Sequence, residues 1–266
     1  MSIKGVSVSF SGGKDSTAML IQLLERGVEI DNIVFADTGF EFPELYEYIK
    51  SVGEYIDREI TILKPEKDLF KKWFYGKITR GEKEGRVRGF PKIINPCWWT
   101  REAKIKPLDN MNKTADLIYV GIAYDEQERI KPSTKIKYPL NEWKWTEAKC
   151  VKFLNEIKLF NPLYVNFDRL GCFFCHKQST KSLFVLWKLY PKLFDIMKYW
   201  DNENINLNLG SITIPDLNVI EKNFEEGKKP KRLPKYDCWN GCESVKKAFQ
   251  FQQKGLGSFG DWGCRV

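Results

Sequence analysis

The segment Ser11-Gly12-Gly13-Lys14-Asp15-Ser16 lies between an apolar stretch and a helical pattern. This arrangement restricts the possible folds of the chain more than any other feature of its sequence. Residues 5–10 alternate apolar and small side chains, which predicts a buried strand. Residues 16–26 carry apolar side chains at helical spacing, and Gly27 ends that pattern. A strand that turns through two glycines into a helix predicts an α/β domain with an anion-binding turn.

The residue types in this loop suit a phosphate site. Glycines let backbone N–H groups approach phosphate oxygens, and the helix N-terminus adds partial positive charge. Lys14 adds a full charge, and Asp15 is expected either to hold Mg²⁺ or to cap the helix. The Walker spacing G-x-x-x-x-G-K-S/T is absent, which excludes a P-loop kinase or GTPase. We expect phosphate contacts from Ser9, Ser11, Gly12, Gly13, Lys14, Asp15, Ser16 and Thr17.

A simple tight turn is the alternative, but it would not require the flanking Lys14 and hydroxyl groups.

The rest of the chain continues the order of strand and helix. Strands are predicted at residues 30–37, 59–63 and 116–122, and helices at 43–56, 68–75, 101–111, 146–157 and 179–200. The helix at 101–111 is expected to be interrupted at Lys106-Pro107. Such βαβ units predict a parallel sheet.

Two further stretches are less regular. Residues 76–89 are charged and punctuated by glycine, which predicts a mobile surface loop that could serve as a lid. Beyond residue 202 the helical periodicity weakens.

Composition restricts the setting and the partners. With 266 residues, 42% of them hydrophobic and 29% charged, the chain is expected to fold in water. No apolar run approaches the roughly 18 to 20 residues that cross a bilayer, and residues 1–5 lack a signal-peptide core, so we expect a cytoplasmic location without membrane contact. The net charge of +8 favours polyanionic partners such as DNA or RNA. Seven unevenly spaced cysteines favour metal or redox chemistry over disulfides.

The Ser-Gly-Gly-Lys-Asp-Ser loop after a first strand resembles the signature of the PP-loop ATP pyrophosphatases, which adenylate carbonyl oxygens. Over about the first two thirds of its length the chain resembles the branch that contains phosphoadenylylsulfate (PAPS) reductase. The segments that carry this resemblance are Asp37-Thr38-Gly39-Phe40-Glu41, Trp99-Thr100-Arg101-Glu102-Ala103-Lys104-Ile105-Lys106-Pro107-Leu108, and Gly121-Ile122-Ala123-Tyr124-Asp125-Glu126 through Arg129. Trp99 stands where many relatives have cysteine, and Ala123 replaces an arginine.

The resemblance implies a three-layer, adenine nucleotide alpha hydrolase-like domain with a parallel sheet for residues 1–165. It implies that the nucleotide is bound by Asp37, Thr38, Gly39, Gly121 and Arg129, besides the loop. It also implies a catalytic role for Lys14, Asp15 and Lys104. Lys104 and Arg129 could instead belong to a solvated basic face. The intact loop implies that ATP itself is used with Mg²⁺, because sulfate-assimilation reductases of this branch carry degenerate loops.

Residues 166–266 are expected to form a mostly helical region that contains cysteines. Cys172 and Cys175 have the C-x-x-C spacing with which two thiolates hold one zinc ion or one iron–sulfur cluster. The remaining ligands are either Cys238 and Cys242 or Cys97. Cys150 is expected in the core. His176, the single histidine, is expected to pack beside the site rather than to bind the metal.

The Gly-Cys-x-x-Cys segment is also similar to that of the adenylating enzyme of DNA phosphorothioation, which carries an iron–sulfur cluster. We therefore expect an ATP-dependent adenylating enzyme that activates a nucleic acid for sulfur insertion, with sulfur from a donor such as a cysteine desulfurase. One alternative is a thiol-dependent reductase of PAPS or adenylylsulfate, with Cys264 as the nucleophile. Another is a non-enzymatic nucleotide-binding module with a zinc-bound tail. Four tryptophans could stack on bases or belong to the core: Trp98, Trp99, Trp143 and Trp145.

Overall fold

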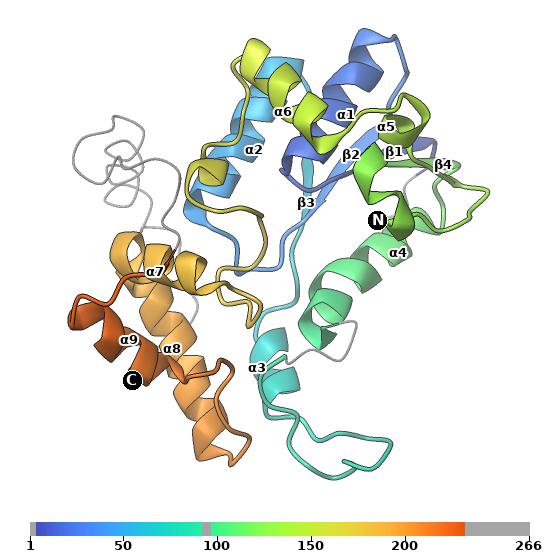
Figure 1. Ribbon diagram of the computed structural model, residues 1–266. Coiled ribbons are helices and arrows are strands. Elements are labelled where there is room, and N and C mark those ends of the chain that lie inside the picture. The colour runs from blue at the N-terminus through green and yellow to red at the C-terminus, as the bar shows by residue number, and fades with distance from the viewer. Residues whose placement is uncertain (1–3, 92–96, 232–266) are drawn as a thin grey trace. The chain divides into compact units, whose positions relative to one another are not determined.

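The computed structural model describes residues 4–91 and 97–231, which are drawn as the coloured ribbon in Figure 1. The chain divides into two compact units. Unit 1 comprises Met1–Gly39, Leu45–Phe70 and Ile93–Asn161, and unit 2 comprises Phe40–Glu44, Lys71–Lys92 and Pro162–Val266. Unit 2 thus draws on three separate stretches of sequence. The separate roles expected of residues 1–165 and 166–266 stay a prediction.

Unit 1 is built on five parallel strands in the order β3-β2-β1-β4-β5. These are β1 (Val6–Phe10), β2 (Asn32–Ala36), β3 (Thr61–Leu63), β4 (Leu117–Val120) and β5 (Ile136–Lys137). Val8 in β1 pairs with Ile33 on one side and with Tyr119 on the other, so β1 is the central strand. The strand order reverses between β1 and β4. In open α/β sheets such a switch point leaves a crevice at the carboxyl ends of the strands, where ligands bind.

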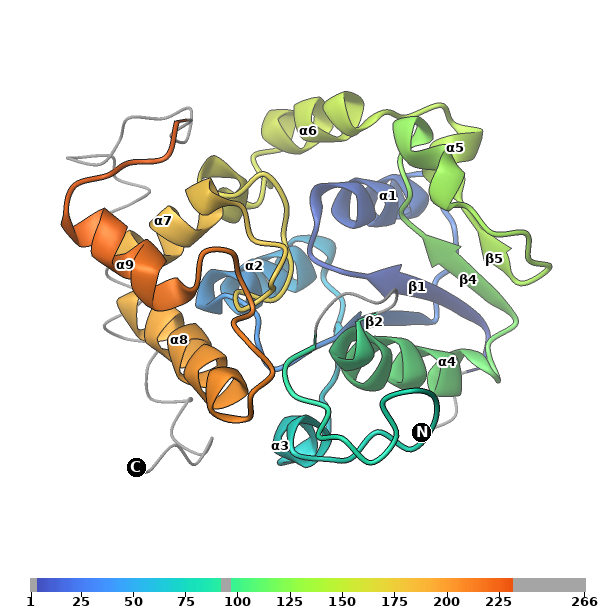
Figure 2. The same ribbon diagram turned by 60° about the horizontal axis from the view of Figure 1, so that its bottom comes forward.

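Helices cover both faces of this sheet. The elements that lie in unit 1 wholly or for the most part are α1 (Lys14–Glu25), α2 (Pro43–Ile56), the π-helix η1 (Thr100–Ile105), α4 (Lys106–Asn112), the 3-10 helix η2 (Tyr124–Arg129), α5 (Pro139–Glu142) and α6 (Glu147–Glu156). Figure 2 shows α1 and α4 on opposite faces of the strands. The expected three-layer α/β fold with a parallel sheet is therefore confirmed.

The strands of unit 1 are apolar because both of their faces are covered. In β2, four of the five residues are buried, as expected for a parallel strand between two helical layers. Val34 of β2 packs with Ala115 and with Ile118 of β4, and Leu108 of α4 closes this cluster. At the interruption predicted near Lys106-Pro107, η1 ends at Ile105 and α4 begins at Lys106, but both residues have helical φ and ψ, so the backbone passes from π-helix to α-helix without a break.

Unit 2 is mostly helical in its described part, as expected for the C-terminal region. It contains most of α3 (Leu69–Phe74), η3 (Pro162–Val165), α7 (Thr180–Leu189), α8 (Pro191–Asn206) and α9 (Leu217–Glu225). Its core is rich in aromatic rings. Phe40 stacks on Phe174 at 3.8 Å between ring centroids, and Phe74 packs against Trp200 at 4.8 Å.

One expectation for unit 2 is wrong. The single helix predicted at 179–200 is two helices, because Pro191 has no N–H and disfavours helical geometry at Tyr190, whose φ and ψ are −130° and 56°. The weak pattern after residue 202 nevertheless includes α9, whose N-cap Asp216 accepts a hydrogen bond from the N–H of Val219. In the described part of the chain, no helix is both long enough and apolar enough to cross a membrane.

Burial decides between the two roles left open for two of the four tryptophans. Trp99 and Trp145 are buried, so these two belong to the core and cannot stack on bases. Trp98 and Trp143 are only half-buried. Trp98 stacks on Phe70, and the guanidinium of Arg26 lies 4.3 Å above the ring of Trp143.

Candidate active site

The loop between β1 and α1 has a conformation that requires glycine. Gly12 has a φ of +69°, and a Cβ atom there would lie 2.6 Å from Cδ1 of Leu45. Its carbonyl accepts a 2.9 Å hydrogen bond from Nδ2 of Asn161, a fully buried side chain 149 positions further along the chain. The loop is thus fixed both by its own backbone and by a distant part of unit 1.

Two of the hydroxyl groups expected to face a ligand instead hold the loop together. Ser16 and Thr17 are both buried. Each donates a hydrogen bond to the carbonyl of Gly13, and the Ser16 hydroxyl also accepts one from the N–H of Ser11. Ser9, in the central strand, and Ser11 are half-buried.

The start of α1 is arranged for an anion. Gly13 is the N-cap residue, so the first N–H groups of the helix have no capping side chain. Asp15 lies in the first turn and does not cap the helix, which leaves metal binding as its remaining predicted role. A helix N-terminus with exposed N–H groups attracts phosphate oxygens.

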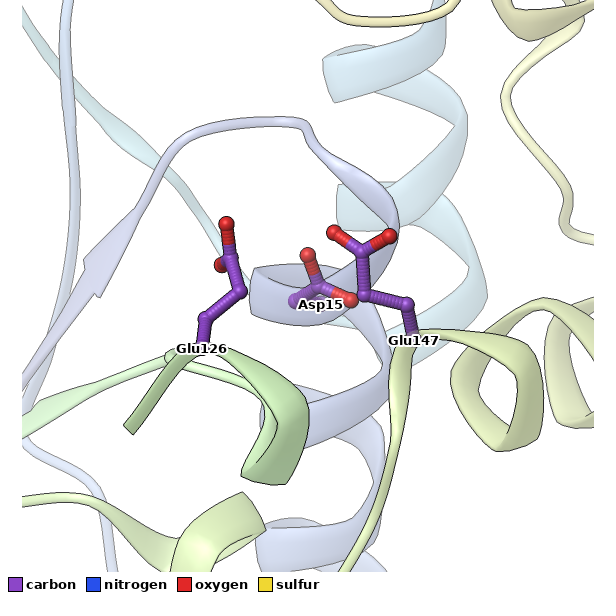
Figure 3. A group of neighbouring side chains, drawn as sticks. All are labelled: Asp15, Glu126 and Glu147. Carbon is purple, nitrogen blue, oxygen red and sulfur yellow. The ribbon is translucent and has the colours of Figure 1, made fainter. Parts of the chain in front are cut away.

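Three carboxylates gather beside this loop. Figure 3 shows Asp15 on α1 between Glu126 of η2 and Glu147 at the start of α6. One oxygen from each of the three lies within 4.8 Å of the others. Glu126 and Glu147 were not predicted as site residues.

Lys14 neutralises part of this acidic group. Its Nζ lies 3.0 Å from Oδ2 of Asp15 and 2.7 Å from Oε1 of Glu147. The other Asp15 oxygen, Oδ1, is buried and has no hydrogen-bond partner among the described residues. Burial raises the pKa of Asp15, the contact with Lys14 lowers it, and the charges of Glu147 and Glu126 raise it further. A buried, orphaned carboxylate oxygen beside two other carboxylates fits a hard cation such as Mg²⁺.

Contacts of η2 with the residues at and just before the start of α6 bring Glu126 and Glu147 together. The N–H of Tyr124 donates to the carbonyl of Trp145 at 2.8 Å. The carboxylate of Asp125 accepts a hydrogen bond from the backbone N–H of Glu147 at 3.0 Å. The hydroxyl of Thr146, the N-cap residue of α6, accepts a hydrogen bond from the backbone N–H of Lys149. Asp125 therefore fixes the first turn of α6 beside η2.

Gly121 brings the end of β4 against the loop. A Cβ atom at this position would lie 2.7 Å from Cα and 2.9 Å from N of Ser16. Both are backbone atoms, so no side-chain movement could relieve the clash. The structure thus brings the predicted residue Gly121 to the loop, at the point where the strand order reverses.

The other predicted nucleotide-binding residues lie in different settings. Asp37 and Thr38 are buried after β2, and Asp37 Oδ1 accepts hydrogen bonds from the N–H of Gly39 and the hydroxyl of Tyr46. The side chain of Arg129 is 58% exposed and pairs with Glu126. Lys104 is half-buried in η1, and within the described residues no hydrogen bond or ion pair joins it to the loop.

Cys150 lies in the core, as predicted, but it also borders the site. It is fully buried on α6, and burial together with the neighbouring charge of Asp15 raises the pKa of its thiol to about 12. The Cys150 thiol is therefore a neutral group against the Asp15 carboxylate.

The C-x-x-C segment forms a turn in unit 2. The N–H of Cys175 donates to the carbonyl of Cys172 at 3.1 Å, and the two residues between them, Phe173 and Phe174, are buried. The two aromatic rings anchor the turn while both cysteines stay half-buried. The four cysteines of the described region are thiols: Cys97, Cys150, Cys172 and Cys175.

The predicted metal site is only partly described. Cys97 belongs to unit 1, whereas Cys172 and Cys175 belong to unit 2. Cys238, Cys242 and Cys264 lie outside the described residues. Which cysteines complete a metal site stays a prediction.

A pocket of about 480 Å³ adjoins the C-x-x-C turn in unit 2. His176, which follows Cys175, lines it together with Gln178 and the basic residues Lys228 and Lys229. Gln178 also donates from Nε2 to the carbonyl of Cys172 at 3.3 Å. The apolar wall of this pocket consists mainly of Leu183, Ile212, Ile220 and Phe224.

Comparison with known proteins places this geometry in a family. Residues 5–178 match the phosphoadenosine phosphosulfate reductase domain. Two uncharacterized proteins of Methanocaldococcus jannaschii are similar: MJ0066 is 31% identical over 215 residues, and MJ0973 is 26% identical over 204 residues. These matches cover 75% and 71% of this chain, but only 41% and 46% of the relatives, so the chain spans less than half of their length.

An uncharacterized nin region protein, ORF290 of Escherichia phage lambda, is 26% identical, and the match covers 66% of this chain and 67% of that protein. Two solved structures are also similar. The PAPS reductase of Candida auris, in a phosphate complex, has a TM-score of 0.45 and 17% identity over 62% of this chain and 80% of its own. The U34-tRNA thiolase NcsA of Methanococcus maripaludis, with its [4Fe-4S] cluster, has a TM-score of 0.43 and 16% identity over 91% and 77%, respectively.

Proposed function

Because the chain belongs to the phosphoadenosine phosphosulfate reductase domain family, we propose that it is an ATP-dependent adenylating enzyme that activates a substrate for sulfur transfer. One observation carries this proposal. At the switch point of the sheet, the intact Gly-Gly-Lys-Asp loop, which contributes Lys14 and Asp15, lies beside the carboxylates of Glu126 and Glu147. This combination suits a triphosphate that arrives with a divalent cation.

Asp15, Glu126 and Glu147 are the residues that would hold Mg²⁺, because they offer oxygen ligands and one of those oxygens is buried without a partner. When bound, Mg²⁺ supplies positive charge that neutralises phosphate oxygens.

The chain's own groups act on the phosphates. The backbone at Gly12 and Gly13 and the N-terminus of α1 bind phosphate oxygens, and Lys14 adds a positive charge. A substrate oxygen forms a bond to the α phosphorus while the bond from that phosphorus to the bridging oxygen breaks. Pyrophosphate leaves with the bonding electrons, and preorganised donors stabilise the charge that develops on it. AMP stays on the substrate until a sulfur nucleophile displaces it.

The net charge of +8 supports a nucleic acid as the substrate. A cysteine desulfurase is the kind of donor that would supply the sulfur.

Cys172 and Cys175 would hold an iron–sulfur cluster, with Cys97, Cys238 or Cys242 as further ligands, and a structural zinc ion is the alternative. Visible absorbance and metal analysis of anaerobically purified protein distinguish them, because the cluster is coloured and contains iron, whereas zinc is colourless.

The test of adenylation is the identity of the products from ATP labelled at the α phosphate. Anaerobically purified protein, given total RNA or denatured DNA, is expected to form AMP and pyrophosphate. The Asp15→Asn variant should lose this activity, while Glu54→Gln, at an exposed position on α2, should retain it. ADP and phosphate as the products, or no turnover with any nucleic acid, would rule out adenylation. ATP binding without turnover would favour a nucleotide-binding module.

The family itself supports a second candidate, a thiol-dependent reductase of PAPS or adenylylsulfate with Cys264 as the nucleophile. A reductase would release sulfite from PAPS in the presence of a thiol reductant and without ATP. The Cys264→Ser variant should then be inactive. Full activity of that variant would eliminate this candidate.

A further inference from the structure

Residues 76–89, the stretch predicted to be a mobile surface loop, form a hairpin in unit 2. Lys77 pairs with Val87 in an antiparallel bridge, and the N–H of Ile78 donates to the carbonyl of Arg86 at 2.8 Å. Gly81 and Gly85, at the turn, have φ angles of +87° and +80°. Figure 1 shows this hairpin in teal, projecting from the end of α3. We refer to it as the basic hairpin.

Buried contacts fix the base of the basic hairpin. Asn204 of α8 is fully buried, and its Oδ1 accepts the N–H of Phe90 at 2.8 Å while its Nδ2 donates to the carbonyl of Gly210. Gly89 has a φ of +68°, and a Cβ atom there would lie 2.5 Å from Oδ1 of Asn204. The end of the hairpin is therefore locked against α8.

A cation–π contact fixes the other side. The guanidinium of Arg88 lies 4.3 Å above the ring of Trp73, and the same group donates to the carbonyl of Lys77. The base of the hairpin is already ordered before a partner binds. Binding at the tip therefore costs less conformational entropy than binding to a disordered segment would.

The basic hairpin and the end of α3 hold most of the chain's excess positive charge. Between residues 71 and 89 there are seven basic and two acidic residues, a net charge of +5, whereas the whole chain has +8. On the hairpin itself, four of these cations are exposed: Lys77, Arg80, Lys83 and Arg86. None of the four forms an ion pair with a carboxylate of the described residues, so they are available to an external anion.

The scarcity of apolar side chains on the hairpin indicates which class of partner fits. Ile78 and Val87 are half-buried, and every residue from 79 to 86 is polar, charged or glycine. A protein interface needs an apolar centre, and a membrane-binding segment needs apolar side chains to insert. Besides Thr79, Glu82 and Glu84, the tip offers two arginines and a lysine, and such cationic side chains suit phosphate groups, which they bind through their charge.

We propose that the basic hairpin binds the phosphate backbone of a nucleic acid. This inference rests on the proposed function, since it identifies the surface that would hold the nucleic acid to be adenylated. The hairpin makes contact through Arg80, Lys83 and Arg86 at its tip, and Arg88 keeps its position on Trp73.

The experiment compares two triple variants that lose equal charge. One is Arg80→Ala/Lys83→Ala/Arg86→Ala. The other, Lys50→Ala/Lys152→Ala/Lys192→Ala, removes three exposed lysines on α2, α6 and α8. Fluorescence anisotropy measures the binding of labelled single-stranded RNA, stem–loop RNA and single-stranded DNA at several KCl concentrations.

The hairpin variant is expected to bind at least about 10-fold more weakly, and the slope of log Kd against log salt should fall by about 2, since each phosphate contact contributes roughly 0.7 for single strands. The control variant should stay within about 3-fold of the unmodified protein, because distant surface charges act only through the screened field. Equal losses in the two variants would contradict the proposal, as would no binding of any of the three nucleic acids by the unmodified protein.

Two measurements separate loss of contact from loss of folding and from failure of adenylation. Thermal unfolding and ATP binding of the hairpin variant should be unchanged, and Arg80→Lys/Arg86→Lys should keep most of the affinity because it keeps the charge. Hairpin-dependent binding without pyrophosphate release would refute adenylation and leave the hairpin's role intact. Pyrophosphate release with no nucleic-acid binding would refute the hairpin's role and leave adenylation intact.

Discussion

The Nζ atom of Lys14 lies 2.7 Å from Oε1 of Glu147, although the two residues are 133 positions apart. This ion pair joins the glycine loop at the end of β1 to the first turn of α6. It also means that the lysine of the loop and the third carboxylate of the acidic group compensate each other before any nucleotide is bound. Residues that act on ATP in the proposed reaction are therefore linked through a single contact.

Replacing Glu147 with glutamine should weaken metal use more than nucleotide binding. The amide keeps the size of the side chain but loses the negative charge that a cation requires. We expect the Mg²⁺ concentration that gives half-maximal pyrophosphate release to rise about 10-fold or more, in the range found when groups that support a metal are removed. Glu156→Gln, at an exposed position on the same helix, is the control. An unchanged Mg²⁺ requirement would show that Glu147 does not bind the metal.

Removing Lys14 should expose the same carboxylates to added metal. In the Lys14→Ala variant, Asp15 and Glu147 lose the cation that pairs with both. Mg²⁺ should then raise the thermal unfolding midpoint of the nucleotide-free variant more than that of the unmodified protein, while pyrophosphate release falls by about 100-fold or more, as when a group that stabilises developing charge is lost. Lys50→Ala is the surface control. Equal Mg²⁺ stabilisation in all three proteins would contradict competition between Lys14 and the metal.

A methyl group at Gly121 should disrupt the loop. Alanine would place Cβ 2.7 Å from the Cα atom of Ser16, so either β4 or the first turn of α1 must shift. Overpacking of this kind costs about 1–3 kcal/mol of stability, and nucleotide affinity should fall with it. Gly171→Ala is the matched control, because a Cβ atom there would meet nothing within 4 Å. Denaturant unfolding and ATP titration of both variants decide the matter, and equal behaviour would show that the backbone approach at Gly121 is unimportant.

The local elements around the loop were predictable because short-range patterns specify them. The alternation before Ser11 and the proline at the start of residues 43–56 correspond to β1 and α2 in the structure. The break at Pro191 follows from the same kind of local rule, and the apolar periodicity that continues across it concealed the break. Local sequence thus predicted most elements, but not every boundary between them.

The acidic group could not be predicted in the same way. Glu126 lies within a segment that resembles the family, yet nothing in that segment says that its side chain turns toward Asp15. Glu147 is an acidic residue in the first turn of a helix, a position that such residues occupy in many proteins because of the helix dipole. Its place in the site depends on the contact between Asp125 and the start of α6, which is a property of the folded chain.

The raised pKa of Asp15 predicts the direction in which stability depends on pH. Burial lifts this pKa above its ordinary value of 3.8, so the folded protein binds the proton more tightly than the unfolded chain does. Stability from this group is present below pH 3.8 and is lost as the pH rises through the folded pKa. Asp15→Asn removes the effect, so its unfolding midpoint should exceed that of the unmodified protein near pH 7 by more than near pH 4. Thermal unfolding without nucleotide or Mg²⁺, with Glu156→Gln as the control, measures this difference. A constant difference across the pH range would contradict it.

The thiols of the described region should differ sharply in reactivity. Cys150 is fully buried, and its pKa is raised to about 12, so almost no thiolate forms near pH 8. Cys175 is half-buried at a turn, where a reagent can reach it once any bound metal is removed. Iodoacetamide at pH 8 should therefore label Cys175 in the chelator-treated native protein and leave Cys150 unlabelled, whereas both should be labelled in denaturant. Peptide mass spectrometry gives the extent at each site. Labelling of Cys150 in the native protein at a rate near that of Cys175 would show that α6 opens readily, and the fixed position of Glu147 beside the loop would then have to be abandoned.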